Sequence, residues 1–378
     1  MYIMEFKISN FNIMSDKHFD YYTWDEVGTG NGNIVREPIA TRNDRYDEVI
    51  NVITSINDIE KIDVMTFQEV TVHSIVKLRD YAAINNRYSI YENEIKSDDR
   101  PILLATMIKN DLTNAGNIID LTDKYQNFYN KNNYHSGQDD YFSGRAQVFY
   151  IRSKNLIVVN VHAPGLPDGF VQQLWYKNLA AFIRCGCMNN QNKERVCFPD
   201  NRNVKIILIG DFNVSDGAKI FEWTNENNKL PRLHLFDDPN RRYTSYHSGI
   251  KDRNNIWIPD PNPYQKVDHL IYTTDFLPNP RLYVYVSNTV DKAVDNFNND
   301  NNIEHKKIPY SREPALVMNA GPGQGAPNPV NANWNTNFDI DANGWPSDHT
   351  FNLYVFPNIR DIDMLGGGNK TRKYRIIY

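Results

Sequence analysis

The chain has 378 residues, of which 40% are hydrophobic and 12% aromatic, enough to build a sizeable folded core. Its formal net charge of −5 argues against a protein that coats nucleic acid through charge alone. No apolar run reaches the roughly eighteen residues of a membrane span, and the N-terminal segment lacks the pattern of a secretory signal. We therefore expect a soluble, intracellular protein.

The first half of the chain alternates predicted strands and helices. Apolar residues at helical spacing predict helices over 42–59 and 73–84. Short apolar runs predict strands over 3–13, 63–70, 88–91 and 102–108. A segment rich in Asn, Tyr and Asp, over 120–143, is expected to be a loop.

The second half begins with a predicted hairpin over 147–152 and 156–162 and a helix over 171–183, in which Trp175 belongs to the apolar stripe. A buried strand over 204–209 and a helix over 217–227 follow, and then strands over 266–273, 281–287 and 350–356. An Asn-, Gly- and Pro-rich stretch over 288–344 interrupts this pattern, as a substrate-selecting flap or a passive loop. We expect one catalytic domain over 1–357 and a flexible basic tail over 358–378.

Three cysteines, Cys185, Cys187 and Cys197, are too few for a disulfide framework. Their close spacing suggests zinc, but no convincing fourth ligand accompanies them. Reduced thiols are the preferred interpretation.

Polar residues recur where predicted strands end. They are Asn12, Glu69 in Gln-Glu-Val, His162, Asp211 and Asn213 in Gly-Asp-Phe-Asn, Asp268, and Ser347-Asp348-His349 just before the last strand. An apolar run closed by a polar residue is typical of an interior strand that delivers a polar group to a surface cleft.

This series of six motifs, in this order, resembles the exonuclease–endonuclease–phosphatase superfamily, which includes DNase I. The resemblance extends from Asn12 to His349 and so covers nearly the whole chain. It implies a four-layer α/β sandwich of two mixed β-sheets flanked by helices, in which both sheets lead to one cleft.

Phosphate-ester hydrolysis by water needs charge neutralisation, which hard oxygen ligands provide by holding Mg²⁺, with Mn²⁺ as an alternative. Glu69 is the leading candidate ligand, with Asn12 as a neutral partner. Asp348 either binds a second metal or shapes the site.

The remaining motif residues are candidates for catalysis. Asp268 is expected to orient the imidazole of His349, and Asp211 to position or deprotonate the attacking water. Asn213 would donate a hydrogen bond to the phosphate, and His162 would stabilise the developing negative charge. Either Asp211 or His349 could serve as the base, since members of the superfamily differ in this respect.

Substrate contacts are expected from Arg145, Thr244 and Tyr246. The leading hypothesis is a Mg²⁺-dependent phosphodiesterase, most simply a nuclease acting on DNA or RNA, with no protein partner deducible. The alternatives are a phospholipid or sphingomyelin-type phosphodiesterase and a non-catalytic scaffold. The asparagine richness and basic tail resemble those of proteins from large DNA viruses.

Overall fold

The structure is a computed structural model of the chain. It describes residues 5–13, 39–95, 102–113, 116–132, 144–164, 169–185, 204–214, 219–220, 222, 233–236, 245–246, 249–251, 257–259, 264–265, 267–286, 303–307, 347, 349, 351–357 and 359. Among the helices in these ranges, none is long and apolar enough to cross a bilayer.

The first sheet has seven strands in the order β16-β15-β17-β1-β2-β4-β3. Its strands are β1 (Glu5–Asn12), β2 (Val64–Val70), β3 (Tyr88–Ile95), β4 (Ile102–Lys109), β15 (Arg281–Val286), β16 (Ile303–Lys307) and β17 (Phe351–Pro357). The sheet is mixed, because β1 pairs with β2 in parallel and β15 with β16 in parallel, whereas the other pairs are antiparallel.

The second sheet has six strands in the order β5-β6-β7-β8-β14-β9. Its strands are β5 (Ile118–Asp120), β6 (Ala146–Ile151), β7 (Leu156–His162), β8 (Lys205–Asp211), β9 (His234–Leu235) and β14 (Asp268–Tyr272). Here β7 and β8 are parallel and their neighbours antiparallel. Two small ribbons pair β10 (Ser245–Tyr246) with β13 (Tyr264–Gln265) and β11 (Gly249–Lys251) with β12 (Trp257–Pro259).

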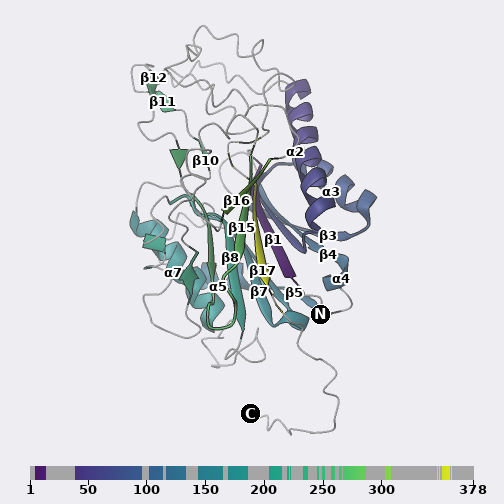
Figure 1. Cartoon of the computed structure of the whole chain (residues 1–378). Helices are drawn as coiled ribbons and strands as arrows, with labels where there is room; N and C mark the ends of the chain where they lie inside the picture. Colours follow the sequence, from purple (N-terminus) through teal and green to yellow (C-terminus); the bar gives the residue numbers. More distant parts are fainter. Residues whose placement is uncertain are drawn as a thin grey trace, which may run out of the picture.

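Helices cover the outer face of each sheet, and three separate apolar cores lie between the layers. α2 (Ile39–Glu60) and α3 (Ser74–Asn85) pack on the first sheet, and α5 (Thr122–Asn132) and α7 (Gly169–Cys185) on the second. The third core joins the two sheets through residues such as Phe6, Ile207 and Phe356. Figure 1 shows the two helix pairs on opposite sides of the strands. The four-layer α/β sandwich predicted from the sequence is confirmed.

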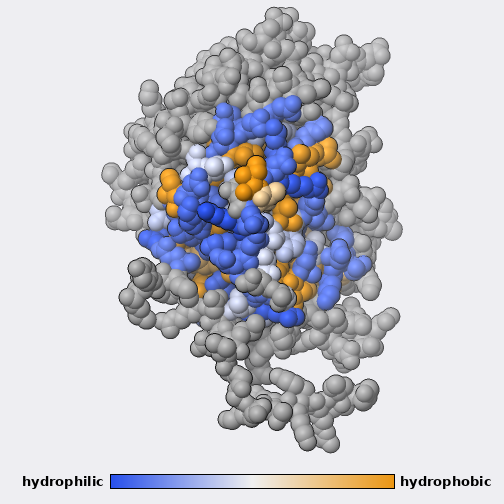
Figure 2. Space-filling model, turned by 90° about the vertical axis from the view of Figure 1, so that its right-hand side faces the viewer, coloured by the Kyte–Doolittle hydropathy of each residue, from blue (hydrophilic) through white to orange (hydrophobic). Residues whose placement is uncertain are grey.

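Figure 2 shows the side of the molecule that carries α2 and α3, where hydrophobic side chains alternate with hydrophilic ones. The exposed large hydrophobic residues in the described ranges include Ile59, Val72, Val76 and Ile84. They belong to different turns of the two helices and to the loop that precedes α3. Single exposed apolar residues of this kind are ordinary for a protein surface.

Most predicted elements are present, but the segment predicted as a loop over 120–143 contains a helix, α5. Leu121, Tyr125 and Phe128 lie at helical spacing and pack in the same core as Phe182 of α7. These few apolar positions in a polar segment gave too weak a periodic signal. The expectation was therefore wrong because tertiary packing stabilises α5.

Part of the predicted insertion is also ordered into the fold. β16 comes from within 288–344 and pairs in parallel with β15 at the edge of the first sheet. The rest of that stretch lies outside the described residues. So does the predicted basic tail over 358–378, except for Ile359, which is buried in the core between the sheets. Two short helical elements, α4 (Asn110–Thr113) and the 3₁₀ helix η1 (Arg152–Lys154), connect strands that follow one another in the chain. Most of the helix predicted over 217–227 lies outside the described residues.

The strands place apolar and polar side chains in separate rows between the sheets. Side chains alternate along a strand, so every second residue faces the other sheet. On β1 the apolar Phe6 and Ile8 are followed on the same face by Asn10 and Asn12, and β7 and β8 repeat this change of polarity. The inter-sheet space is therefore a hydrophobic core at one end and a polar site at the other.

Gly210 on β8 lies unusually close to the backbone of β7. Its φ is +148°, and a Cβ built on it would lie 1.9 Å from the carbonyl oxygen of Val161. Only glycine permits this approach, which sets the position of the following residue, Asp211.

Replacing Gly210 by alanine should therefore destabilise the protein severely, by roughly 3 kcal/mol or more, because backbone atoms must move apart. Gly116→Ala is the matched control: Gly116 also has a positive φ, +77°, but its nearest added contact is the Arg152 side chain at 3.9 Å. Strain alone should cost the control about 1 kcal/mol. Urea unfolding measures both changes, and equal losses would contradict the steric account.

Candidate active site

Six polar side chains from both sheets meet at the polar end of the inter-sheet space. They are Asn12, Glu69, His162, Asp211, Asp268 and His349, and each is at most 6% exposed. Asn12 and Glu69 belong to strands β1 and β2 of the first sheet, and His349 lies just before its strand β17. The other three come from the second sheet. The structure thus brings together residues that are separated by up to several hundred positions in the chain.

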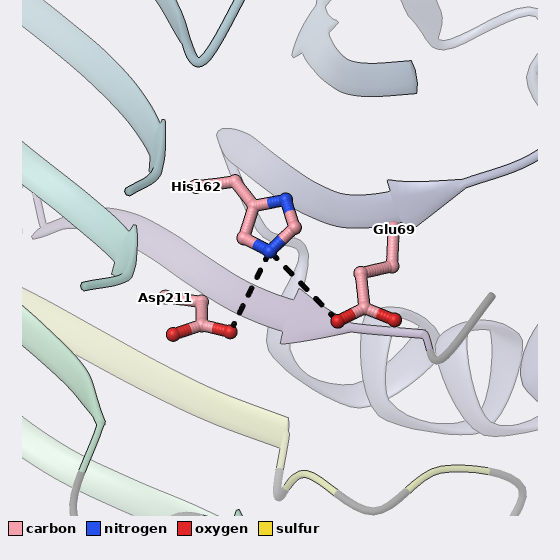
Figure 3. A group of neighbouring side chains, drawn as sticks. All are labelled: Glu69, His162 and Asp211. Carbon is pink, nitrogen blue, oxygen red and sulfur yellow. Dashed lines mark ion pairs between the residues drawn. The ribbon is translucent and has the colours of Figure 1, made fainter. Parts of the chain in front are cut away.

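Glu69, His162 and Asp211 form a group whose ligand atoms all lie within 4.8 Å of one another. His162 Nε2 is 3.8 Å from Glu69 Oε1 and 3.9 Å from Asp211 Oδ2. Figure 3 shows the imidazole between the two carboxylates, with its Nε2 directed at both. Two carboxylate oxygens and one imidazole nitrogen fit a divalent cation such as Mg²⁺, Mn²⁺ or Zn²⁺.

Glu69 reaches the site through an irregularity in β2. Phe67 pairs with Ala105 of β4 and Val70 with Leu103, so that Gln68 and Glu69 lie opposite a single residue. Glu69 has a φ of +55°, which is uncommon for a residue other than glycine. The bulge allows Glu69 to join the polar site, although strict alternation would direct it toward the apolar layer under α2 and α3.

Asn12 links the acidic and basic groups of the site. Its Nδ2 lies 3.0 Å from Glu69 Oε1, 3.1 Å from Asp211 Oδ2 and 3.2 Å from His349 Nε2. With two hydrogens for three acceptors, the amide shares its donors among them. A ligand role for Asn12 needs its amide to turn so that Oδ1 takes the place of Nδ2.

Asp211 holds a proton more tightly than an ordinary carboxyl group. Its pKa is raised to about 7, chiefly by burial and also by the nearby carboxylates of Asp268 and Glu69, whereas His349 opposes the rise. A hydrogen bond from the backbone N–H of Asn213 to Asp211 Oδ1, at 2.8 Å, favours the ionised form. A cation bound beside Asp211 would have the same effect as that bond and displace the proton.

His349 is oriented by a chain of hydrogen bonds that crosses between the sheets. Its Nδ1 lies 2.8 Å from Asp268 Oδ2, and Asn10 Nδ2 donates to the other oxygen, Asp268 Oδ1, at 2.7 Å. The carboxylate accepts a hydrogen bond from Nδ1–H, which leaves Nε2 with a lone pair facing Asn12 and, at 3.8 Å, Asp211 Oδ2. The backbone N–H of His349 also donates to Ser347 Oγ at 3.1 Å.

Asn213 and Arg145 lie beside the site and share one acceptor. Asn213 Nδ2 donates to the carbonyl oxygen of Ala163 at 2.7 Å, and Arg145 Nη1 donates to the same oxygen at 3.4 Å. Gln172 of α7 donates to the carbonyl oxygens of Pro164 and Asn213, at 2.8 and 3.2 Å. These bonds fix the segments that directly follow His162 and Asp211.

Other predicted site residues are placed less completely. Asp348 and Thr244 lie outside the described residues, and of Tyr246 only the backbone is described, in β10. One contributor was not anticipated: Asn10, which holds Asp268. Its signal was present in the sequence, because Asn10 and Asn12 are two residues apart and so share a strand face.

Searches against family models and curated proteins gave no match to this chain. Solved structures do match. ANGEL2, described as a 2′,3′-cyclic phosphatase, matches with a TM-score of 0.50 and 13% identity, over 94% of this chain and 95% of that protein. An endonuclease/exonuclease/phosphatase family protein from Bacteroides thetaiotaomicron has a TM-score of 0.45 and 11% identity, over 94% and 99% of the two chains. Truncated TDP2 from Caenorhabditis elegans has a TM-score of 0.44 and 12% identity, over 94% and 98%.

The match to ANGEL2 is a likeness of fold. Together with the two packed mixed sheets, it shows that the chain has the DNase I-like fold. The fold that the sequence motifs implied is therefore confirmed.

The pKa of Asp211 predicts a pH-dependent stability for the metal-free protein. The pKa of Asp211 in the folded state, about 7, lies above the ordinary value of 3.8, so protonation stabilises the folded state. This contribution is complete below about pH 4 and is lost as pH rises toward 7. In EDTA, the melting temperature of the wild type relative to Asp211→Asn should fall across this interval.

Asp211→Asn keeps the size of the side chain and removes the titration. Thermal melts of both proteins in EDTA, at half-unit steps of pH, measure the difference. A difference in melting temperature between the two proteins that stays constant from pH 4 to pH 8 would contradict the raised pKa of Asp211.

Proposed function

We propose that the protein is a metal-dependent phosphodiesterase that hydrolyses nucleic acid with an activated water molecule. The observation that carries the proposal is the convergence of Glu69, Asp211 and two histidines in one buried site between the sheets. Metal-assisted hydrolysis needs these groups: oxygen ligands, a proton acceptor and a cationic or hydrogen-bonding partner for the phosphate. A purely structural polar cluster would not require three carboxylates in mutual repulsion.

Glu69 and Asp211 would hold the cation, with Asn12 as a third ligand when its amide is turned. A bound divalent cation would neutralise charge on the phosphate and stabilise the leaving oxygen. Mg²⁺ is the proposed ion because it prefers oxygen ligands, and Mn²⁺ is the alternative that also accepts an imidazole.

Two groups are the proposed acceptors for the proton of the attacking water. Asp211 would lose its own proton when the cation binds, and its carboxylate would then be one acceptor. His349 presents its unprotonated Nε2 3.8 Å from Asp211 Oδ2, while Asp268 holds its Nδ1. As the water oxygen bonds to phosphorus, its proton passes to one of these groups, and the ester oxygen leaves with the electrons of its broken bond to phosphorus.

His162, Asn213 and Arg145 would serve the substrate. His162 Nε2 faces the space between Glu69 and Asp211, where it would stabilise negative charge on the phosphate. Asn213 has a second amide hydrogen beyond the one given to Ala163, and we assign it to a phosphate oxygen. Arg145, Thr244 and Tyr246 are proposed to contact the rest of the substrate, and Asp348 to bind a second metal or shape the site.

Nucleic acid is the proposed substrate class. ANGEL2, which matches with a TM-score of 0.50, is described as a 2′,3′-cyclic phosphatase. Other matching structures include TDP2 and a mannosyl-6-phosphatase, so proteins with similar folds act on different phosphoesters. For this reason the decisive experiment offers several phosphoesters rather than one.

The test is hydrolysis of labelled single- and double-stranded DNA and RNA, a 2′,3′-cyclic phosphate and sphingomyelin vesicles, with Mg²⁺ or with EDTA. We expect cleavage of a nucleic acid that needs Mg²⁺ and is lost in Asp211→Ala. Cleavage of the vesicles alone would replace the substrate class, and no metal-dependent cleavage of any substrate would contradict the function.

Glu69→Gln should lower the catalytic rate by roughly 100-fold or more, because the amide keeps the shape of the side chain but weakens cation binding. Higher Mg²⁺ concentrations should recover part of the rate. Glu92→Gln is the matched control, since Glu92 pairs with Arg79 on the exposed β3 edge, away from the site. Equal activity of the two variants at low Mg²⁺ would exclude Glu69 as a ligand.

Asp268→Asn should lower the catalytic rate by about 10²- to 10⁴-fold without a comparable change in Mg²⁺ affinity. The neutral amide has one acceptor oxygen where the carboxylate has two, for the donors Asn10 Nδ2 and His349 Nδ1–H, so the charge and geometry that hold the imidazole are lost. Rates across pH and Mn²⁺ binding by calorimetry separate these effects. A variant that loses metal affinity as much as rate would show that Asp268 supports the metal and not the imidazole.

A further inference from the structure

A set of buried amide and hydroxyl groups lies between the sheets, one row behind the site. Its members are Gln68 of β2, Thr106 of β4, Gln147 of β6 and Asn160 of β7, and each is at most 1% exposed. None of the four belongs to the proposed catalytic or metal-binding groups. Burying so many polar groups is costly unless they bond to one another or to backbone.

Gln68 and Asn160 join the two sheets at this level. Gln68 Nε2 donates to Asn160 Oδ1 at 2.6 Å. Among the residues that the structure describes, Gln68 Oε1 has no hydrogen-bond partner, so the bond to Asn160 is the side chain's described link to the other sheet.

Asn160 also reaches the backbone of the bulge that carries Glu69. Its Nδ2 lies 3.2 Å from the carbonyl oxygen of Phe67 and 3.0 Å from that of Ala105, the last regular pair of β2 and β4 before the register shift. The same nitrogen lies 3.1 Å from Thr106 Oγ1 and Gln147 Oε1, so its two hydrogens are shared among four acceptors.

Thr106 and Gln147 form the outer part of the set. Thr106 Oγ1 donates to Gln147 Oε1 at 2.7 Å, and Gln147 Nε2 donates to the carbonyl oxygen of Tyr91 on β3 at 3.2 Å. These bonds support Asn160 from the side away from Glu69 and do not involve the bulge residues themselves.

We propose that Gln68 and Asn160 are positioning residues that clamp the β2 bulge and thereby direct the Glu69 carboxylate into the site. The bulged backbone, with Glu69 at a φ of +55°, is strained and persists only where its surroundings hold it. Asn160 holds the carbonyl oxygen before the bulge, and Gln68, inside the bulge, is tied to Asn160. The metal-binding consequence of this claim rests on the proposed function, whereas the conformational claim stands without it.

The conformational test is a pair of crystal structures, of Gln68→Met and Thr106→Val. Methionine fills nearly the volume of glutamine but removes the bond to Asn160, and valine removes the Thr106 hydroxyl at the same depth without touching the bulge. We expect Glu69 Oε1 to leave Asn12 Nδ2, now 3.0 Å away, in Gln68→Met and to keep it in Thr106→Val. Should Gln68→Met not fold, Gln68→Ala removes the same bond without added bulk and carries the same expectation.

Mn²⁺ titration of the full chain by calorimetry provides the second readout. Gln68→Met should bind Mn²⁺ about tenfold more weakly than the wild type, and Thr106→Val within about twofold of it, in line with other supporting residues around metal ligands. Melting temperatures of both variants control for general destabilisation.

The outcomes separate the two proposals. A Gln68→Met structure in which Glu69 keeps its positive φ and its contact with Asn12 would overturn the positioning role, whatever the metal data. Wild-type protein that binds no Mn²⁺ would contradict the proposed function, and the pair of structures would still decide the positioning claim. Equal loss of Mn²⁺ affinity in Gln68→Met and Thr106→Val would also overturn the positioning role, since the effect would not be specific to the bond between Gln68 and Asn160.

Discussion

The burial of three carboxylates in one space between the sheets is the constraint on which the rest of the site depends. Glu69, Asp211 and Asp268 are each at most 3% exposed, so water does not offset their mutual repulsion. Asp268 accepts hydrogen bonds from Asn10 and His349, whereas Asp211 has its pKa raised to about 7. A proton or a cation must therefore neutralise this site, and exchange between them couples pH to metal binding.

The sandwich architecture creates this constraint because side chains alternate between the two faces of each strand. Because side chains alternate, a change from apolar to polar residues at every second position divides the inter-sheet space into a core and a site. The same rule cannot place Glu69, which needs a bulge to face the site. Glu69 thus lies in the bulge, where the regular alternation of β2 is interrupted, and the buried amides of Gln68 and Asn160 lie beside this bulge.

The sequence predicted the fold, and most of the residues proposed for the site lie together between the sheets, because the motifs that identify them are local. Asp211 ends an apolar run, His162 ends another, and such ends meet at one edge of a sheet. What it could not predict depends on contacts across the two sheets: the link from Asn10 to Asp268, the bulge at Glu69 and the buried amides. α5 was missed for a related reason, since its few apolar residues are recognised only against α7.

Anomalous X-ray scattering from crystals soaked in Mn²⁺ and inorganic phosphate would show whether a divalent cation binds between the carboxylates of Glu69 and Asp211. We predict one strong manganese peak about 2.1 Å from oxygens of both residues, with the phosphate on the side of His162. A manganese peak elsewhere, or none in this site when the crystals are soaked at neutral pH, would contradict this prediction.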